Sequence, residues 1–286
     1  MIRSVKKIYN AVEAPIDNLT TYRAMPTDGI GHIDPFLFLN HHGPQFYDTH
    51  NNGLPFGPHP HRGFETLTLI LEGELMHWDS DGGKNIINSG GIQWMTAGSG
   101  LVHAEISSDE FKKTGGTIEI VQIWLNLPAR LKMTRPKYIG LQKEQIPSFK
   151  IDEGKVTIHA IAGKFNNVNG AVKSLTGIQI AWLQMKSGGI YSDLVVGSRN
   201  ILFYVVSGRV HVNGKEADLH QLVDFDNNGD EIVCEAIEDS TVIFGHGLPF
   251  HEPIVAQGPF VMNNVGEIKQ AYLDYQNGKM GNWKNL

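Results

Sequence analysis

Residues Gly57–Gly73 read GPHPHRGFETLTLILEG, and residues Gly98–Ser107 read GSGLVHAEIS. His59 and His61 stand two positions apart in the first stretch. His103 and Glu105 have the same spacing in the second. A strand sends residues i and i+2 to the same face, so each pair can point into one cavity. The segment between the stretches is long enough for several antiparallel strands, which would bring the second pair beside the first.

Three neutral imidazoles and one carboxylate form a ligand set that suits a divalent first-row metal. On an octahedral ion they would leave positions open for water, substrate or dioxygen. A His-x-His pair by itself is also common among ordinary core and surface histidines. Pro60 lies between the two histidines and indicates a strand edge, and glycines such as Gly57 and Gly63 allow tight bends beside it. The pattern therefore predicts a metal site on β-strands.

Three longer motifs follow one another along the chain: HPHRGFET (His59–Thr66), QWMTAGSGLVHAE (Gln93–Glu105) and EPIVAQGPFVMN (Glu252–Asn263). Together they resemble the pirin family, a branch of the cupin superfamily. The resemblance spans nearly the whole chain and implies an all-β fold of two tandem cupin β-barrels, with one metal in the N-terminal barrel. It implies a mononuclear site whose metal ligands are His59, His61, His103 and Glu105. It also implies iron as the metal, with nickel, manganese, zinc and copper as alternatives.

Glu65 is a second candidate carboxylate. The general cupin pattern takes its carboxylate ligand from the glutamate four residues after the second histidine, which here is Glu65. In a regular strand it would share a face with the first histidine pair, so parity alone does not exclude it. The spacing of His103 and Glu105 resembles the pirin arrangement and favours Glu105 as the ligand. We then expect Glu65 to orient an imidazole by accepting its free N–H, or alternatively to pair with Arg62.

The chain has 286 residues, enough for two domains with separate cores. Prolines and charges in residues 135–148 predict a connection between them. We therefore expect a metal-binding barrel at residues 1–138 and a second, cupin-like barrel at residues 139–286. The second half repeats the strand-and-turn pattern of the first, which suggests duplication. It contains no His-x-His pair, and we expect it to lack a metal site.

The segment GEIKQAYLDYQNGKMG (Gly266–Gly281) predicts one short C-terminal helix. Ile268, Ala271, Tyr272 and Tyr275 follow the spacing i, i+3, i+4 and i+7 and would share a face. Gly278 is a suitable residue for the end of the helix.

Composition narrows the class of protein. No apolar run approaches the length needed to span a bilayer, and the first residues lack the apolar segment of a signal peptide. The single cysteine, Cys234, permits no internal disulfide and is expected in the core. The net charge of −6 gives no support for direct binding to nucleic acid. We expect a soluble, cytoplasmic protein that binds neither membrane nor nucleic acid.

The resemblance implies a quercetin 2,3-dioxygenase, which opens the central ring of a flavonol with dioxygen and releases carbon monoxide. Glu105 or Glu65 could take the proton of the flavonol hydroxyl as the catalytic base. Phe56, Phe64, Trp94 and Met95 could line a pocket for the flat substrate. The alternative is a non-enzymatic metal- or redox-sensing protein that binds a regulatory protein partner. An isomerase would require more basic residues than Arg62 near the site.

Overall fold

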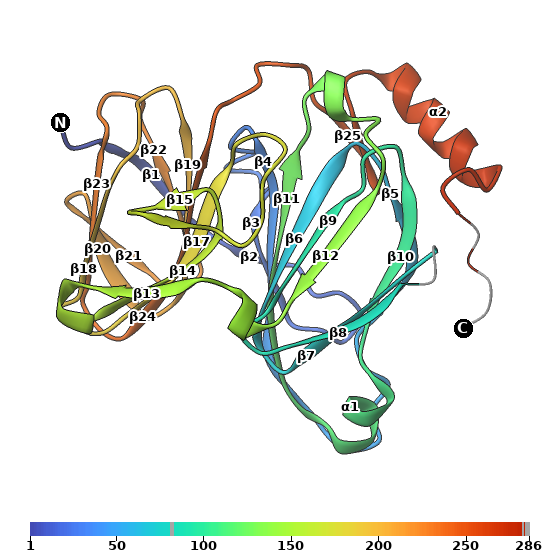
Figure 1. The fold of residues 1–286 in the computed structure, drawn as a ribbon, viewed down its shortest axis with the longest axis horizontal. Coiled ribbons are helices and arrows are strands. Elements are labelled where there is room, and N and C mark those ends of the chain that lie inside the picture. Colours follow the sequence, from blue (N-terminus) through green and yellow to red (C-terminus); the bar gives the residue numbers. More distant parts are fainter. Residues whose placement is uncertain (81–82, 282, 284–286) are drawn as a thin grey trace. The chain divides into compact units, whose positions relative to one another are not determined.

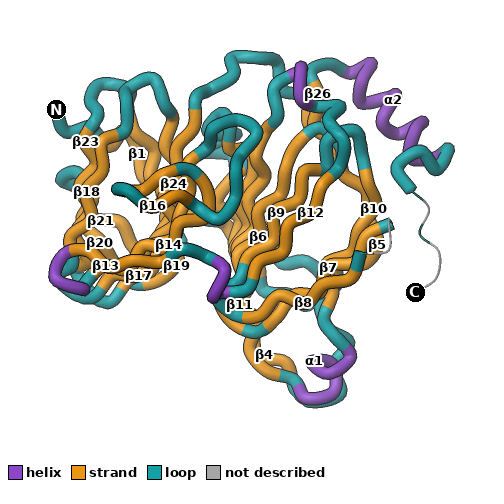
Figure 2. The backbone as a smooth tube through the Cα atoms, in the orientation of Figure 1, coloured by secondary structure: helices purple, strands orange, loops and turns teal. Residues whose placement is uncertain are grey.

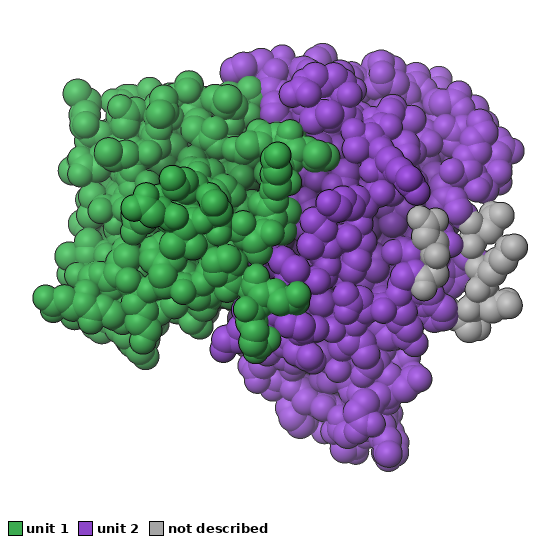
Figure 3. All heavy atoms as spheres, viewed as in Figure 1, with its two compact units in different colours: residues 1–12, 22–37, 144–249 green, residues 13–21, 38–143, 250–286 purple. Residues whose placement is uncertain are grey.

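The computed structural model describes residues 1–80, 83–281 and 283. The chain forms two compact units, and each unit takes segments from several parts of the sequence (Figure 3). Unit 1 consists of residues 1–12, 22–37 and 144–249, and unit 2 of residues 13–21, 38–143 and 250–286. Strands dominate both units (Figures 1 and 2), which confirms the all-β class.

Unit 1 contains two main antiparallel sheets and the two-stranded hairpin β15-β16. The larger has the strand order β1-β22-β19-β24-β17-β14-β13, and the smaller has the order β18-β23-β20-β21. Side chains from both sheets form one core, in which the rings of Phe203, Phe244 and Tyr191 are fully buried. Its strands are β1 (Val5–Asn10), β13 (Ser148–Ile151), β14 (Val156–Ala162), β15 (Lys164–Phe165), β16 (Val168–Asn169), β17 (Gln179–Met185), β18 (Ile190–Leu194), β19 (Asn200–Ser207), β20 (Arg209–Val212), β21 (Lys215–Asp218), β22 (Gln221–Phe225), β23 (Glu231–Ala236) and β24 (Ser240–Gly247).

The alternation of apolar and polar residues explains the smaller sheet of unit 1. In β23 every second residue, Ile232, Cys234 and Ala236, is buried, while its neighbours reach the surface. This is the period of a strand with one face on the core. Cys234 is therefore a core residue, as expected, and burial raises the pKa of its thiol to about 12.

Unit 2 also contains a larger and a smaller sheet. The larger includes the neighbouring strands β12-β9-β6-β11-β4, and the smaller has the order β5-β10-β7-β8. Its elements are β4 (Phe36–Tyr47), β5 (Phe56–His61), β6 (Phe64–Glu72), β7 (Glu74–Asp79), β8 (Lys84–Asn88), β9 (Ile92–Thr96), β10 (Leu101–Ile106), α1 (Asp109–Thr114), β11 (Gly116–Asn126), β12 (Lys137–Leu141), β25 (Val255–Gln257), β26 (Phe260–Met262) and α2 (Val265–Gln276). The strands β2 (Val12–Glu13) and β3 (Thr21–Met25) each cross a boundary between a segment of unit 1 and a segment of unit 2. Short 3₁₀ turns occupy Ala129–Leu131, Lys143–Gln145 and Asp152–Gly154.

The two units do not coincide with the expected division of the chain into residues 1–138 and 139–286. The mid-chain boundary lies between Lys143 and Glu144, because residues 137–141 form β12 and pair with β9 instead of forming a free linker. The tail from Phe250 onward belongs to unit 2, which contains the histidine motifs, and not to unit 1, which contains residues 144–249.

The C-terminal helix α2 ends two residues before Gly278, with Asn264 as its N-cap. Ile268 and Ala271 are buried in one apolar cluster that also contains Val102 and Phe260. Tyr275 was expected on this face, but it is 39% exposed. Asp274 occupies the buried position in its place because Arg62 and Lys279 compensate its charge. Within the described part of the chain, no helix has the length and apolar character of a membrane span.

Candidate metal centre

Two paired strands of unit 2 bring three histidines together. In the antiparallel pair β5 and β10, which lie side by side in Figure 1, His103 stands opposite His59 and Leu101 stands opposite His61. The ring centroid of His103 lies 4.4 Å from that of His59 and 5.1 Å from that of His61. One nitrogen of each of the three rings lies within 4.8 Å of the others. The predicted histidine cluster therefore exists, and it follows directly from strand parity.

Backbone carbonyl groups orient two of these imidazoles. His59 Nδ1 lies 2.7 Å from the carbonyl oxygen of Gly57, and His61 Nδ1 lies 3.2 Å from that of Pro259. A carbonyl only accepts hydrogen bonds, so each Nδ1 carries the hydrogen and each Nε2 keeps a lone pair. The tail of the chain thus positions a histidine of the cluster through Pro259.

His103 is oriented by a neighbouring strand. Its Nδ1 lies 3.4 Å from Nδ1 of His77 on β7, and His77 Nε2 lies 3.3 Å from Oδ2 of Asp79. If His77 donates to the carboxylate, its Nδ1 is the acceptor for the N–H of His103. His103 Nε2 then bears a lone pair, and this buried atom has no hydrogen-bond partner among the described residues. The ring of Tyr138 stacks on His77 at 3.8 Å and holds it in place.

Burial keeps His61 and His103 neutral. It lowers the pKa of His61 to about 3, with a further lowering from neighbouring His59. Burial also lowers the pKa of His103 well below its usual value, and His59, His61 and His77 add to this effect. Neutral imidazole nitrogens with free lone pairs are the donors that a transition metal needs. The three histidines, and above all the orphaned Nε2 of His103, therefore fit a metal ion.

Glu105 follows His103 by two positions on β10 but is outside the group of three close nitrogen donors. Its carboxylate is buried and accepts hydrogen bonds from Thr68 Oγ1 at 3.1 Å and from Gln122 Nε2 at 2.7 Å. On the other strand of the pair, a bulge between Phe56 and His59 interrupts the register opposite Glu105. These contacts hold the carboxylate in one orientation near the three histidines.

Glu65 does not follow the parity of the first histidine pair. Gly63, with a φ of +90°, separates β5 from β6, so the two strands are not one regular strand. Glu65 Oε1 accepts hydrogen bonds from Thr96 Oγ1 at 2.6 Å and Trp94 Nε1 at 3.0 Å. Among the described residues, Glu65 forms no hydrogen bond with an imidazole or with Arg62, in contrast to both expectations.

The second oxygen of Glu65, Oε2, is buried and has no partner among the described residues. Burial raises the pKa of this carboxyl group, although the hydrogen bonds from Thr96 and Trp94 oppose the shift. Arg62 contacts a different carboxylate, that of Asp274. The structure thus places Glu65 in a buried hydrogen-bond network with β9.

Aromatic side chains stand against one side of the histidine cluster. The rings of Phe64 and Trp124 lie 5.0 Å and 5.3 Å from that of His61, and 4.4 Å from each other. Phe38 stacks on Trp124 at 4.6 Å. Of the four aromatic or apolar residues expected here, Phe64 contacts a ligand candidate, whereas Phe56 contacts His42. The remaining two, Trp94 and Met95, are buried in the core.

Comparison with known families identifies both halves of the chain. The family model described as Pirin matches residues 18–125, and the model described as Pirin C-terminal cupin domain matches residues 180–281. The chain belongs to the pirin family. Its bicupin architecture, predicted from the sequence motifs, is thereby confirmed.

Individual pirin relatives match over nearly their full length. A protein of Pseudomonas aeruginosa, provisionally named as a quercetin 2,3-dioxygenase, is 35% identical over 93% of this chain and 91% of its own. The pirin of Homo sapiens is 32% identical over 91% and 87% of the two chains. A solved structure of a quercetin 2,3-dioxygenase from Acinetobacter baumannii has 34% identity and a TM-score of 0.92, covering 98% of this chain and 99% of that one.

The sequence missed two groups in this pirin site. His77 was not predicted as part of the site, yet it contacts His103; its spacing of two from Asp79 was the available signal. Trp124 and Gln122 were not singled out, although they alternate on β11 in the same way as the histidine pairs on their strands. On the neighbouring strand β6, Gln122 stands opposite Thr68 and Trp124 stands opposite Thr66, so these four residues lie on the same face of the sheet.

Proposed function

We propose that this pirin is a metal-dependent dioxygenase that cleaves flavonols such as quercetin between carbons 2 and 3. One dioxygen is consumed for each carbon monoxide released, and both of its oxygen atoms remain in the ring-opened ester. The observation that carries the proposal is the convergence of three imidazoles, with a buried Nε2 on His103 that has no hydrogen-bond partner among the described residues. Full-length similarity to proteins named as quercetin 2,3-dioxygenases supports it.

His59, His61 and His103 would hold the metal through Nε2, and we propose Glu105 as the fourth ligand. The ion, which we propose to be iron, with nickel, manganese, zinc or copper as alternatives, would supply Lewis acidity for the flavonol 3-hydroxyl and open positions for dioxygen. The carboxylate of Glu105 could accept the hydroxyl proton, because Thr68 and Gln122 hold it in a fixed orientation beside the cluster.

The aromatic side chains would orient the substrate. Phe64 and Trp124 both contact the ring of His61. Phe64 is fully buried, so the half-buried ring of Trp124 would offer the flat apolar surface next to the proposed ligands. A planar flavonol can stack on such rings, which places its hydroxyl group toward the histidines. We assign Glu65 an indirect contribution, since its carboxyl group holds Trp94 and Thr96.

An oxygen-uptake assay tests the proposal. The protein is purified without oxygen, its metal is quantified, and quercetin loss, dioxygen uptake and carbon monoxide are measured together. We expect equal molar amounts of all three, and none with the matched flavone that lacks the 3-hydroxyl group. A His61→Ala protein should be inactive. If the metal-loaded protein consumes no dioxygen with any flavonol, the enzyme proposal fails and the metal-sensing regulatory protein becomes the better hypothesis.

A further inference from the structure

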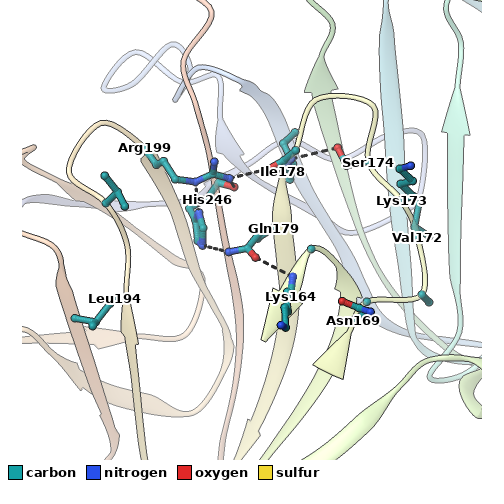
Figure 4. Close-up of a pocket in the computed structure, with 15 residues that line it drawn as sticks. Lys164, Asn169, Val172, Lys173, Ser174, Ile178, Gln179, Leu194, Arg199 and His246 are labelled. Atoms are coloured by element: carbon teal, nitrogen blue, oxygen red, sulfur yellow. Dashed lines mark hydrogen bonds between the residues drawn. The ribbon is translucent and has the colours of Figure 1, made fainter. Parts of the chain in front are cut away.

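Unit 1 contains a cavity of about 770 Å³ that the proposed chemistry does not use (Figure 4). Its wall includes the hairpin of β15 and β16, the beginning of β17, the residue before β19 and the end of β24. The volume lies within the range of roughly 300–1,000 Å³ that is typical of small-molecule sites. All of its lining residues belong to unit 1, whereas the histidine cluster belongs to unit 2.

The charged lining of this cavity has one sign. Lys164, Lys173 and Arg199 line it, and no lining residue is acidic. Arg199 Nη2 donates to the carbonyl oxygens of Gly177 at 2.7 Å and His246 at 3.1 Å. No ion pair between Arg199 and a carboxylate is recorded within the described residues. A partly buried guanidinium stays charged, so its uncompensated charge favours an anion in the cavity.

The hydrogen-bond network beside Arg199 has one more donor than it has acceptors. Arg199 Nε donates to His246 Nδ1 at 2.5 Å, so the hydrogen of a neutral His246 ring must sit on Nε2. That nitrogen lies 2.7 Å from the side-chain nitrogen of Gln179, whose Oε1 accepts the backbone N–H of Lys164 at 2.8 Å. Whichever way the Gln179 amide is turned, one donor faces another donor.

Burial explains why His246 is neutral here. Burial lowers the pKa of His246 to about 3, and the positive charge of Arg199 lowers it further. The imidazole therefore serves as an acceptor that fixes Arg199 against the cavity wall, as the dashed lines in Figure 4 show.

Apart from the polar residues Asn169 and Ser174, the rest of the lining is apolar or glycine. Val172 and Ile178 are buried, whereas Leu194 and Val196 are 74% and 64% exposed at the cavity. Exposed aliphatic side chains beside fixed cations suit a molecule with an apolar body and one charged end. An inorganic anion would leave this apolar surface without a partner.

We propose that the cavity binds a small organic carboxylate with an apolar body. The carboxylate pairs with the guanidinium of Arg199, with Lys164 and Lys173 contributing charge, and the apolar body packs against Leu194 and Val196, which expose aliphatic surface at the cavity. The site is independent of the metal centre and of the proposed dioxygenase activity.

Calorimetric titration of the full-length protein tests the site, with cinnamate as the probe and cinnamyl alcohol as its uncharged match. We expect saturable binding of cinnamate and at least about tenfold weaker binding of the alcohol, because a charge-assisted pair contributes at least that factor. Arg199→Gln should weaken cinnamate binding by about tenfold or more. Lys173→Glu, at the exposed rim, should also weaken binding without affecting the fold.

The matched control is Arg209→Gln, which removes an exposed cation that pairs with Asp218 at 3.8 Å in the same unit. It should leave cinnamate binding unchanged. Three results would overturn the proposal: no saturable cinnamate binding up to its solubility limit, equal binding in both the Arg199→Gln and Lys173→Glu proteins, or equal binding of inorganic phosphate. If cinnamate binding is lost in His61→Ala but kept in Arg199→Gln, the carboxylate binds at the metal centre and the proposal is wrong.

Discussion

Nη1 of Arg62 lies 2.8 Å from Oδ2 of Asp274, and this ion pair ties the residue next to His61 to helix α2. Both side chains are largely buried. Arg62 Nε also donates to the carbonyl oxygen of Ser99 at 2.7 Å, in the turn that precedes β10. One guanidinium therefore holds β5, the turn before β10 and the C-terminal helix together within unit 2.

Asp274→Asn should loosen this connection. Lys279, Arg62 and Gln270 hold the pKa of Asp274 well below its usual range, so its charge is present at neutral pH. Loss of that charge should lower the free energy of unfolding by about 1–3 kcal/mol, measured by chemical denaturation. The matched control is Asp239→Asn, whose partner Lys186 is exposed. If the two variants lose equal stability, the contact with Arg62 is not what holds the tail.

Metal content should separate the ligands from the residues that orient them. His61→Ala removes a proposed ligand, and metal analysis should find far less than one ion per chain. His77→Ala removes only the partner of His103, and metal affinity should fall by about 10–100-fold. His211→Ala, an exposed histidine of β20, should keep the wild-type content. A full equivalent of metal in the His61→Ala protein would show that the proposed site is wrong.

The two carboxylates should respond differently to neutralisation. Glu105→Gln should impair both metal binding and turnover, because this carboxylate lies beside the histidines with Thr68 and Gln122 as donors. Glu65→Gln should keep the metal and change turnover only through Trp94 and Thr96. Metal analysis together with the dioxygen assay distinguishes the two effects. Loss of metal in Glu65→Gln with retention in Glu105→Gln would restore the general cupin arrangement.

His246 should make the protein sensitive to acid. Its pKa is about 3 in the folded protein, against roughly 6.5 when unfolded, so between these pH values the unfolded state binds more protons. The free energy of unfolding should therefore fall as the pH is lowered from about 6.5 toward 3, by up to ~1.4 kcal/mol per pH unit from this residue. Chemical denaturation at a series of pH values gives the free energy of unfolding. Over this interval it should fall more steeply with falling pH in the wild type than in the His246→Asn protein. Parallel curves would contradict the assignment.

Much of the architecture was readable from local pattern. Strand parity predicted that His59 and His61 share a face, because side chains in a strand alternate with a period of two. The expected antiparallel strands between the two stretches predicted that His103 joins them, and β5 and β10 do pair in this way. The longer motifs predicted the bicupin fold, and the spacing of Ile268 and Ala271 predicted the buried face of α2.

The sequence failed where parity was broken or where distant segments meet. Gly63 turns the chain between β5 and β6, so Glu65 contacts Trp94 and Thr96 and not a histidine. The assignment of Tyr275 to the buried face failed because Arg62, more than 200 positions away, provides a partner for Asp274.

The sequence by itself therefore determined which side chains share a face and which residue types could bind a metal. Only the tertiary structure decided that residues 250–286 pack on the unit with the histidines, where Pro259 orients His61. It also decided that His77 supports His103. The physical reason is that alternation along a strand is set by local backbone geometry. The meeting of distant segments depends instead on how the whole chain buries its apolar surface and compensates its charges.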